Sequence, residues 1–232
     1  MSVKTCVITG ASRGIGLATA LRFARQGCNV AAVARNGADL TAAAKQVRAL
    51  GGACEAIVRD VADPAGAHEA IALAAEHFGQ VDILVNNAGA APLAPIEQFT
   101  RADFERVVAV NMAAVFYTTQ AVWPIMRRQN GGVIVNVSSV ASVDPYPGFA
   151  VYGASKAWVN LFSQALAGEG KPFGIRVFAV APGAVDTKLL RSNFPDYPAD
   201  QALAPDDVAA VIESACDPRL APASGQTLFV RK

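Results

Sequence analysis

Short apolar runs rich in valine and isoleucine alternate along this chain with longer segments of helical period. Seven runs occur, with the sequences CVITG, VAAVA, CEAIVRD, VDILVNNAG, GVIVNVSS, IRVFAVAPG and TLFV. Near-continuous apolar runs of this length indicate strands that are buried on both faces, as in a parallel sheet whose connections are helices. The sequence therefore predicts an α/β fold, with one doubly wound sheet of about seven parallel strands flanked by helices.

The segments between these runs are expected to form helices. Their ranges are Gly14–Arg25, Gly37–Ala49, Pro64–His77, Thr100–Arg128, Val151–Ala167 and Asp206–Ser214. No repeat, linker or low-complexity tract divides the chain, so residues 1–232 are expected to form a single domain. The segment 188–205 contains three prolines and no clear period, which predicts a long loop beside the substrate.

The charge and hydropathy of the chain argue against two classes of partner. The formal net charge is +1 and no run of like charge occurs, so no strong field favours nucleic acid or an anionic membrane surface. The apolar stretches are interrupted by polar residues or glycine, and none approaches the ~18 residues that a membrane-spanning helix needs. A small-molecule substrate is therefore the expected partner.

The first residues and the cysteines indicate a cytoplasmic protein. The segment VKTCVITG places β-branched residues directly before a glycine turn, which predicts a strand rather than a signal peptide. Cys6, Cys28, Cys54 and Cys216 show no C-x-x-C spacing and no nearby histidine cluster. Buried reduced thiols are therefore expected, with no metal site.

A glycine-rich loop, TGASRGIG, follows the first run and opens the first expected helix. Gly10, Gly14 and Gly16 would let the backbone turn tightly and approach a pyrophosphate, which the helix N-terminus holds through its free N–H groups and its dipole. The spacing G-x-x-x-G-x-G differs from the commonest dinucleotide fingerprint. A turn without a ligand is the alternative, but the position after the first strand favours a dinucleotide site.

The end of the second run favours NADP(H) over NAD(H). An NAD site usually has an acidic residue about 20 residues after the glycines, whereas here Ala34 and Arg35 end the run and no carboxylate precedes Asp39. A guanidinium can form a charge-assisted pair with the 2′-phosphate, which a carboxylate would repel. Arg13, inside the glycine loop, can add a second positive group. Either arginine alone is also typical of a solvated surface, so the prediction depends on their agreement with the missing acid.

Tyr152 and Lys156, in the segment VYGASKAW, are four residues apart and would share one face of a helix. Reduction of a ketone requires a proton donor at the developing alkoxide. Lowering the pKa of a tyrosine by about 3 units from near 10 requires roughly 4 kcal/mol. An ammonium about 5 Å away supplies roughly 3 kcal/mol at an effective dielectric of about 20, and an oxidised nicotinamide would add positive charge. We therefore expect Lys156 to lower the pKa of Tyr152, although the spacing alone also fits an ordinary helical pair.

Two further polar residues are candidates for the same site. Ser139 ends the fifth run 13 residues before Tyr152, and its hydroxyl could polarise a carbonyl oxygen. Ser138 would face the other way on an extended strand. Asn111 lies inside the apolar stretch VVAVNMAAVF, where a buried asparagine satisfied by backbone groups is one interpretation.

Five motifs occur in order along the chain, namely TGASRGIG, NNAG, NVSS, YGASK and APGAVDT. With them the chain resembles the short-chain dehydrogenase/reductase family, from about Val3 to Thr187 and more weakly to TLFV. The resemblance implies a single Rossmann-like catalytic domain that transfers a hydride between a nicotinamide and a carbonyl or alcohol carbon. The 3-oxoacyl reductases that use NADP(H) are among the members that it resembles.

The resemblance also implies roles for individual residues. The family's catalytic tetrad matches Asn111, Ser139, Tyr152 and Lys156, with Lys156 bonded to the nicotinamide ribose and Asn111 linked to it through water. Asp60 would lie beside the adenine, although a helix-capping aspartate is the alternative, for which Asp63 fits better. The implied cofactor-binding positions are Gly10, Ser12, Arg13, Gly14, Ile15, Gly16, Arg35, Asp60, Val61, Asn87, Ala88, Gly89, Tyr152, Lys156, Pro182, Gly183, Val185 and Thr187.

Aromatic and aliphatic residues near the expected substrate loop could line an apolar mouth, or could pack the loop down. They are Tyr146, Phe149, Leu189, Phe194 and Tyr197. A basic rim for an acyl carrier protein could comprise Arg127, Arg128 and Lys171, which a charged helix end explains equally well.

Three functions fit these patterns. The first is an NADP(H)-dependent carbonyl reductase or alcohol dehydrogenase, and the second is a 3-oxoacyl acyl-carrier-protein reductase. The third is a catalytically silent cofactor-sensing or scaffold protein, against which the retained Tyr152 and Lys156 argue. A homodimer or homotetramer is expected, with the helices Thr100–Arg128 and Val151–Ala167 as the family-like interface.

Overall fold

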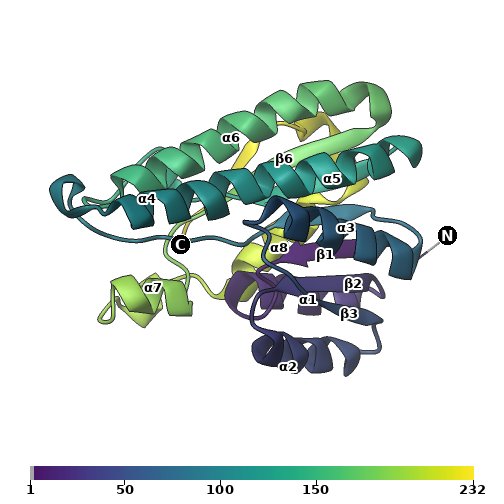
Figure 1. The fold of residues 1–232 in the computed structure, drawn as a ribbon, viewed down its shortest axis with the longest axis horizontal. Coiled ribbons are helices and arrows are strands. Elements are labelled where there is room, and N and C mark those ends of the chain that lie inside the picture. Colours follow the sequence, from purple (N-terminus) through teal and green to yellow (C-terminus); the bar gives the residue numbers. More distant parts are fainter. Residues whose placement is uncertain (1–2) are drawn as a thin grey trace.

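The computed structural model describes residues 3–232, which form one seven-stranded parallel sheet with helices on both faces (Figure 1). Its strand order is β3-β2-β1-β4-β5-β6-β7, and every neighbouring pair is parallel. The predicted Rossmann-like fold is thus confirmed. The strands are β1 (Thr5–Thr9), β2 (Asn29–Ala34), β3 (Cys54–Val58), β4 (Ile83–Asn86), β5 (Gly132–Val137), β6 (Ile175–Pro182) and β7 (Thr227–Val230).

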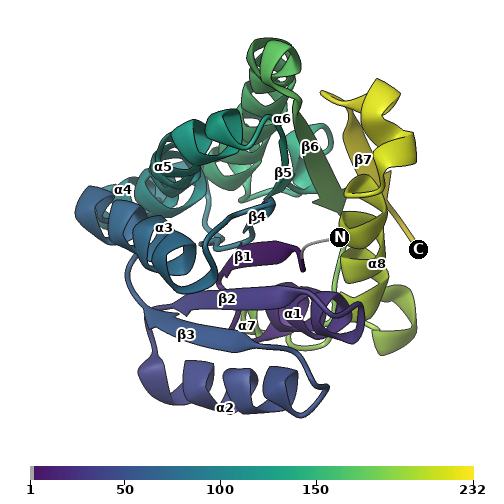
Figure 2. The same cartoon turned by 90° about the vertical axis from the view of Figure 1, so that its right-hand side faces the viewer.

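Two helical layers cover the sheet, as Figure 2 shows. Apolar residues of the first, second and last helices form one core with the sheet, and those of the third, fifth and sixth helices form the other. The helices are α1 (Gly14–Arg25), α2 (Gly37–Arg48), α3 (Pro64–Phe78), α4 (Arg101–Val107), α5 (Ala114–Arg128), α6 (Ala150–Gly170), α7 (Lys188–Asn193) and α8 (Pro205–Ala215). The six predicted helices are present, with ends that shift by a few residues.

The order of the strands reverses between β1 and β4. From β1 the chain winds outward through β2 to β3, then returns to place β4 on the other side of β1. Crossover connections leave in opposite directions from this point, so a crevice opens beyond the carboxyl ends of the two strands. The glycine-rich loop follows β1 at this position.

The long helix expected over Thr100–Arg128 contains a π-helical turn. Between α4 and α5, the segment Val108–Ala113 is π-helical, with Asn111 buried within it. A π turn accommodates one additional residue and is frequent at functional sites. The helix continues past Pro124, the eleventh residue of α5, and ends at Arg128.

Buried polar side chains link the centre of the sheet to α5 and α6. The Asn86 amide donates to Asn136 Oδ1 at 2.9 Å, and the Thr118 hydroxyl donates to Asn86 Oδ1 at 2.7 Å. The Asn136 amide donates to Ser163 Oγ at 2.9 Å. Because buried polar groups are costly unless they are paired, these bonds fix the two helices against the ends of β4 and β5.

The segment 188–205 is not the long irregular loop that was expected. It begins with α7, whose first turn is capped by the Thr187 hydroxyl accepting from Leu190 N at 3.3 Å. A 3-10 turn follows at Ala199–Gln201, and Pro205 already belongs to α8. A threonine at the N-cap position, directly before the first helical residue, can start a helix despite the prolines that follow.

The four cysteines are free and buried, as expected. No helix in residues 3–232 is both long and apolar enough to cross a membrane. Within the same residues, no group of three or more histidine, cysteine or carboxylate side chains is placed to hold a metal ion.

Gly16 is predicted to be indispensable for the first βα turn. A Cβ atom at Gly16 would clash with the Gly10 carbonyl and would lie 2.6 Å from Asn87 Nδ2, so the backbone of the glycine-rich loop would have to shift. We expect Gly16→Ala to lower the free energy of unfolding by about 3 kcal/mol, measured by urea denaturation. Gly168→Ala is the control, since a Cβ at this position in the last turn of α6 meets nothing within 4 Å; there alanine should leave the stability unchanged or raise it by up to about 0.5–1 kcal/mol. Equal effects at the two positions would contradict this account.

Candidate functional site

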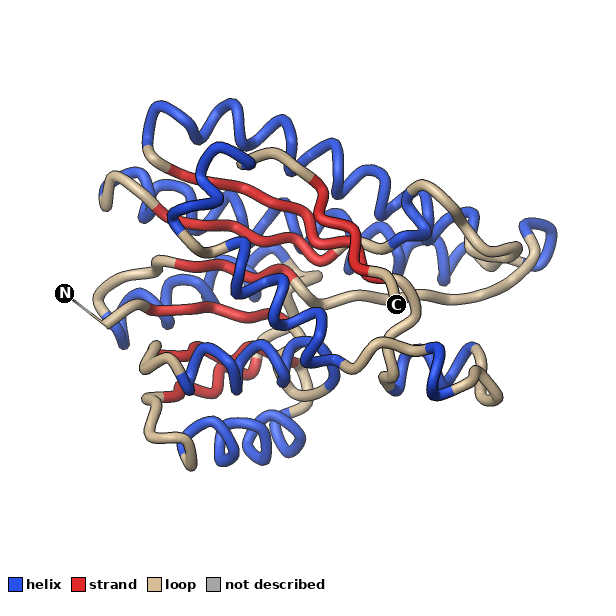
Figure 3. Tube along the Cα trace, turned by 180° about the vertical axis from the view of Figure 1, so that it is seen from behind, coloured by secondary structure: helices blue, strands red, loops and turns tan. Residues whose placement is uncertain are grey.

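A cleft of about 1180 Å³ lies beyond the carboxyl ends of the strands. Its walls come from the loops that follow β1, β2, β3, β4, β5 and β6, together with α6 and α7. Figure 3 shows α7 and the end of β7 at this same edge of the sheet. This is where an open α/β sheet binds its ligands.

Hydrogen bonds between the ends of β1 and β4 shape the glycine-rich loop. Thr9 Oγ1 accepts from the backbone N–H groups of Asn87 and Ala88, and Asn87 Nδ2 donates to Thr9 O at 2.9 Å and Gly10 O at 3.2 Å. Gly10 and Gly14 have φ values of 66° and 56°, in the left-handed region that favours glycine. The loop can therefore follow this path only with glycine at these positions.

The N-terminus of α1 faces the cleft without a side-chain cap, unlike those of α2 and α3, which Asn36 and Asp63 cap. Its first N–H groups and its dipole favour an anion. The glycines leave room for close approach of a diphosphate. The residues present therefore fit a dinucleotide.

The far end of the cleft, beyond β2 and β3, contains several charged side chains. Arg35 is 71% exposed, and its nearest carboxylate is Asp60, with Nη1 and Oδ2 3.7 Å apart. Asp60 Oδ1 accepts from Ala62 N, whereas Asp63 caps α3, so Asp60 is not the helix cap. Arg59 and Asp39 also line this end, and Arg59 is paired with Glu69. The cleft here combines positive charge with two carboxylates.

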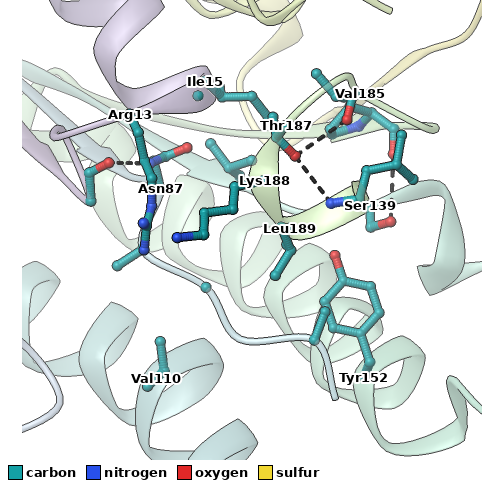
Figure 4. A pocket seen from close by; sticks show the side chains of 18 of the residues that line it. Arg13, Ile15, Asn87, Val110, Ser139, Tyr152, Val185, Thr187, Lys188 and Leu189 are labelled. Atoms are coloured by element: carbon teal, nitrogen blue, oxygen red, sulfur yellow. Dashed lines mark hydrogen bonds between the residues drawn. The ribbon is translucent and has the colours of Figure 1, made fainter. Parts of the chain in front are cut away.

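Ser139, Tyr152 and Lys156 come together in the middle of the cleft. Figure 4 shows the Tyr152 hydroxyl directed toward Ser139. Lys156 Nζ donates to Val137 O at 2.7 Å and lies 5.8 Å from the centroid of the Tyr152 ring. Ser138 Oγ instead donates to Lys156 O at 3.0 Å, so the two serines point in different directions, as expected.

Burial shifts the pKa values of both Tyr152 and Lys156. It raises the pKa of the Tyr152 phenol, an effect that the neighbouring Ser139 hydroxyl partly offsets. It also lowers the pKa of the Lys156 ammonium to about 8. The lowered Tyr152 pKa that we expected from Lys156 together with an oxidised nicotinamide is not found in the chain itself, because loss of hydration disfavours the charged form of both groups.

Asn111 does not line the cleft but lies directly behind it. Its Oδ1 accepts from Ala90 N at 2.8 Å, and its Nδ2 donates to Ala90 O at 2.9 Å and to Ser155 Oγ at 3.0 Å. This is the buried asparagine satisfied largely by backbone groups. A Cβ atom added to Gly89 would be 3.7 Å from Asn111 Oδ1 and 3.9 Å from Lys156 Nζ, so both side chains approach the same residue.

Most of the cofactor-binding residues suggested by the sequence line the cleft. They are Gly10, Ser12, Arg13, Gly14, Ile15, Arg35, Asp60, Val61, Asn87, Ala88, Gly89, Tyr152, Lys156, Pro182, Gly183, Val185 and Thr187. Gly16 does not, because it packs against Gly10 and Asn87.

Several residues of the cleft were not singled out from the sequence. Arg59 directly precedes Asp60 and follows β3, so the rule that ligands bind beyond strand ends would have found it. Asp39 lies four residues after Arg35. Lys188 and Asn193 are brought in by α7, and Val110 by the π turn. No motif indicates these three.

The five residues expected at an apolar mouth all line the cleft. The suggested basic rim, in contrast, lies at the opposite edge of the sheet. Arg127 and Arg128 end α5 just before β5 begins, and Lys171 precedes β6. Arg127 packs over the Phe173 ring at 4.5 Å, so these residues belong to charged helix ends rather than to the cleft.

Comparison with known proteins agrees with this architecture. Residues 4–198 match the family described as short chain dehydrogenase. The 3β-hydroxysteroid dehydrogenase 1 of Eggerthella lenta is 39% identical, over 98% of this chain and 92% of that protein. A 3-oxoacyl acyl-carrier-protein reductase of Thermotoga maritima is 37% identical, over 90% of this chain and 88% of that one.

Solved structures show the same fold. The 3-ketoacyl acyl-carrier-protein reductase of Brucella melitensis, complexed with NADH, superposes with a TM-score of 0.90 at 34% identity, covering 98% of this chain and 96% of that one. Levodione reductase gives a TM-score of 0.92 at 27% identity, with coverage of 98% and 96%. The fold, the sequence match and the relatives together show that the chain belongs to the short-chain dehydrogenase family.

Proposed function

We propose that the chain transfers a hydride between NADP(H) and a carbonyl or alcohol carbon, with Tyr152 as the residue that exchanges the proton. Family membership makes the chain an oxidoreductase of CH–OH and C=O groups. The observation that carries the proposal is the position of the Tyr152 hydroxyl. It points toward Ser139 in the middle of the cleft, between the glycine-rich loop and the apolar mouth (Figure 4).

Different residues of the cleft have different roles in the reaction. In reduction, the carbonyl carbon gains a hydride and its oxygen gains a proton from Tyr152, while Ser139 donates a hydrogen bond to that oxygen. A raised pKa keeps Tyr152 protonated and ready to donate, and an alkoxide is far more basic than a phenolate. Lys156 holds its charge next to the phenol, and Asn111 supports the wall behind it.

The glycine-rich loop and the N-terminus of α1 would hold the diphosphate of the dinucleotide, and Asn87 to Gly89 with Pro182 to Thr187 would flank its nicotinamide half. When bound, the nicotinamide supplies or accepts the hydride. Arg35 and Arg13 would bind the 2′-phosphate. Because Asp39 and Asp60 lie at the same end of the cleft, Arg35 has to outweigh their repulsion.

Removing the phenol hydroxyl should abolish most of the turnover. We expect Tyr152→Phe to lower kcat by about 10²- to 10⁴-fold, measured as NADPH consumption with a panel of ketones that includes an acetoacetyl thioester. NADPH should still bind, as followed by its fluorescence. Unchanged turnover in Tyr152→Phe on a substrate of the unsubstituted protein would rule out this mechanism. NADPH binding without turnover of any ketone would instead favour the cofactor-sensing protein.

Arg35 should decide the preference between the cofactors. We expect Arg35→Ala to lower kcat/KM for NADPH about 10- to 100-fold by loss of a charge-assisted hydrogen bond, with NADH changed less than threefold. Arg101→Ala is the control, because Arg101 is 90% exposed on α4, where it pairs with Glu105. Tighter binding of NADH than of NADPH, or an unchanged preference in Arg35→Ala, would overturn the NADP(H) proposal.

The charge on Lys156 should make stability depend on pH. The folded chain releases this proton near pH 8 and an unfolded lysine near its ordinary value of 10.5. Between these values the unfolded state binds more protons, so the free energy of unfolding should rise with pH, by about 3 kcal/mol in total. Urea denaturation from pH 7 to 10.5 should show this rise relative to Lys156→Met. Lys45→Met, at an exposed position of α2, should show the same rise with pH as the unsubstituted protein. If the difference in unfolding free energy between the unsubstituted protein and Lys156→Met did not change with pH, the assignment would be contradicted.

A 3-oxoacyl acyl-carrier-protein reductase is the second candidate, because two relatives with that activity are 37% and 34% identical. The residues suggested as a docking rim do not support it, since they lie away from the cleft. Faster turnover of the acetoacetyl thioester than of every simple ketone would favour this function.

Exposed apolar side chains on α4, α5 and α6 support the proposal of a homodimer or homotetramer. Phe104 is 51% exposed, Phe116 41% and Leu161 68%. Water-exposed apolar residues that gather on neighbouring helices are typical of an interface.

A further inference from the structure

An aromatic wall stands directly over Tyr152. The Phe149 ring lies 5.0 Å from the Tyr152 ring and 5.9 Å from the Phe194 ring, and Phe194 lies 5.2 Å from Tyr146, each measured between centroids. Phe194 contacts the Tyr146 and Phe149 rings edge to face. Three of these residues come from the turn before α6 and its first turn, and Phe194 follows α7, so the wall joins two segments far apart in the sequence.

The wall is partly open to solvent. Tyr146 is 59% exposed and Leu189, which also lines the cleft, is 45% exposed. Asn193 Nδ2 donates to Ala91 O at 2.8 Å, which fixes the end of α7 to the loop after β4. The apolar surface is therefore held in place before any ligand arrives, and an apolar ligand would cover it without a large ordering cost.

Charge is distributed unequally along the cleft. Arg13, Arg35 and Arg59 lie at the glycine-rich loop and beyond β2 and β3, and Lys188 points away from the wall, toward Asn87, in Figure 4. In the segment 144–156, which carries Tyr146, Phe149 and Tyr152, the charged residues that line the cleft are Asp144 and Lys156. The Asp144 carboxylate makes no hydrogen bond or ion pair with any side chain in the described part of the chain.

We propose that the substrate is an uncharged ketone, or the corresponding alcohol, on a bulky apolar ring system that packs against Phe149 and Phe194, and that Asp144 excludes anionic carbonyl compounds. This rests on the proposed function, because it assigns a substrate class to the same site. An apolar ring gains by leaving water against the aromatic wall. A carboxylate or phosphate on the substrate would find no cation there other than Lys156, which is buried and already donates to Val137 O, and it would be repelled by Asp144.

The size of the effect on turnover follows from burial. Each methylene that leaves water is worth about fourfold in kcat/KM, up to the extent of the wall. Decalone, a ketone with two fused rings, should therefore exceed cyclohexanone by well over tenfold. Methyl 4-oxocyclohexanecarboxylate should exceed its own free acid, which is anionic at neutral pH, by at least tenfold.

Two variants assign the effects to residues. Phe194→Ala should reduce the advantage of decalone over cyclohexanone about tenfold, because it removes the central ring of the wall. Asp144→Asn should raise kcat/KM for the free acid relative to its methyl ester by roughly 3- to 10-fold. Leu73→Ala, on the exposed side of α3, is the control and should change neither ratio. Lys188→Met should also leave the ratio of acid to ester unchanged.

Calorimetric titration of decalone into the protein with NADP⁺ separates this inference from the function itself. Binding that weakens in Phe194→Ala, without turnover of any ketone, would support the apolar site while the proposed function fails. Equal or faster turnover of the free acid compared with its ester would overturn the inference while the proposed function stands. The inference would also be overturned if Phe194→Ala left the ratio of kcat/KM for decalone to kcat/KM for cyclohexanone unchanged. It would be overturned as well if decalone neither bound nor reacted.

Discussion

The hydrogen bonds between Asn87 and the end of β1 are the interaction on which the rest of the cleft depends. Thr9 and Asn87 exchange bonds across the two strands that lie on either side of the reversal of strand order. They set the starting point of the glycine-rich loop on one side and the path of the chain toward Gly89 on the other. Gly89 in turn lies next to both Asn111 and Lys156, so one set of bonds at the sheet edge places both halves of the site.

The middle of the cleft illustrates a conflict between burial and charge. A reactive phenol and an ammonium must lie close together and away from bulk water, yet removal of water disfavours the charged form of each. The backbone oxygen of Val137 gives the lysine one strong hydrogen bond, and burial still lowers its pKa to about 8. At neutral pH the phenol is therefore neutral while the lysine is still mainly protonated, and stabilisation of a tyrosinate beyond what this one ammonium supplies has to come from a further positive charge.

The residues that could be predicted from the sequence are those that the motifs name directly. The glycine-rich loop, Tyr152 and Ser139 follow from local spacing, because a strand end or one helix face determines where they point. Asn111, in the π turn, bonds to Ala90 and Ser155, which are distant in the sequence, and no local pattern contains those contacts. The capping of α7 by Thr187 is local, but the prolines that follow favoured a loop. The sign of the Tyr152 pKa shift depends on burial, which spacing does not reveal. The misplaced basic rim had a different cause, since the direction of the following strands would have shown that Arg127, Arg128 and Lys171 lie at the wrong edge.

The buried cysteines have a consequence for how the protein can be observed. Burial raises the pKa of Cys6, Cys28, Cys54 and Cys216, so thiolate is scarce at neutral pH and reagents that attack thiolates find little to react with. All four belong to the core that α1, α2 and α8 form with the sheet. Alkylation is therefore expected mainly in molecules whose sheet has opened, so the rate of thiol labelling measures how often the fold opens.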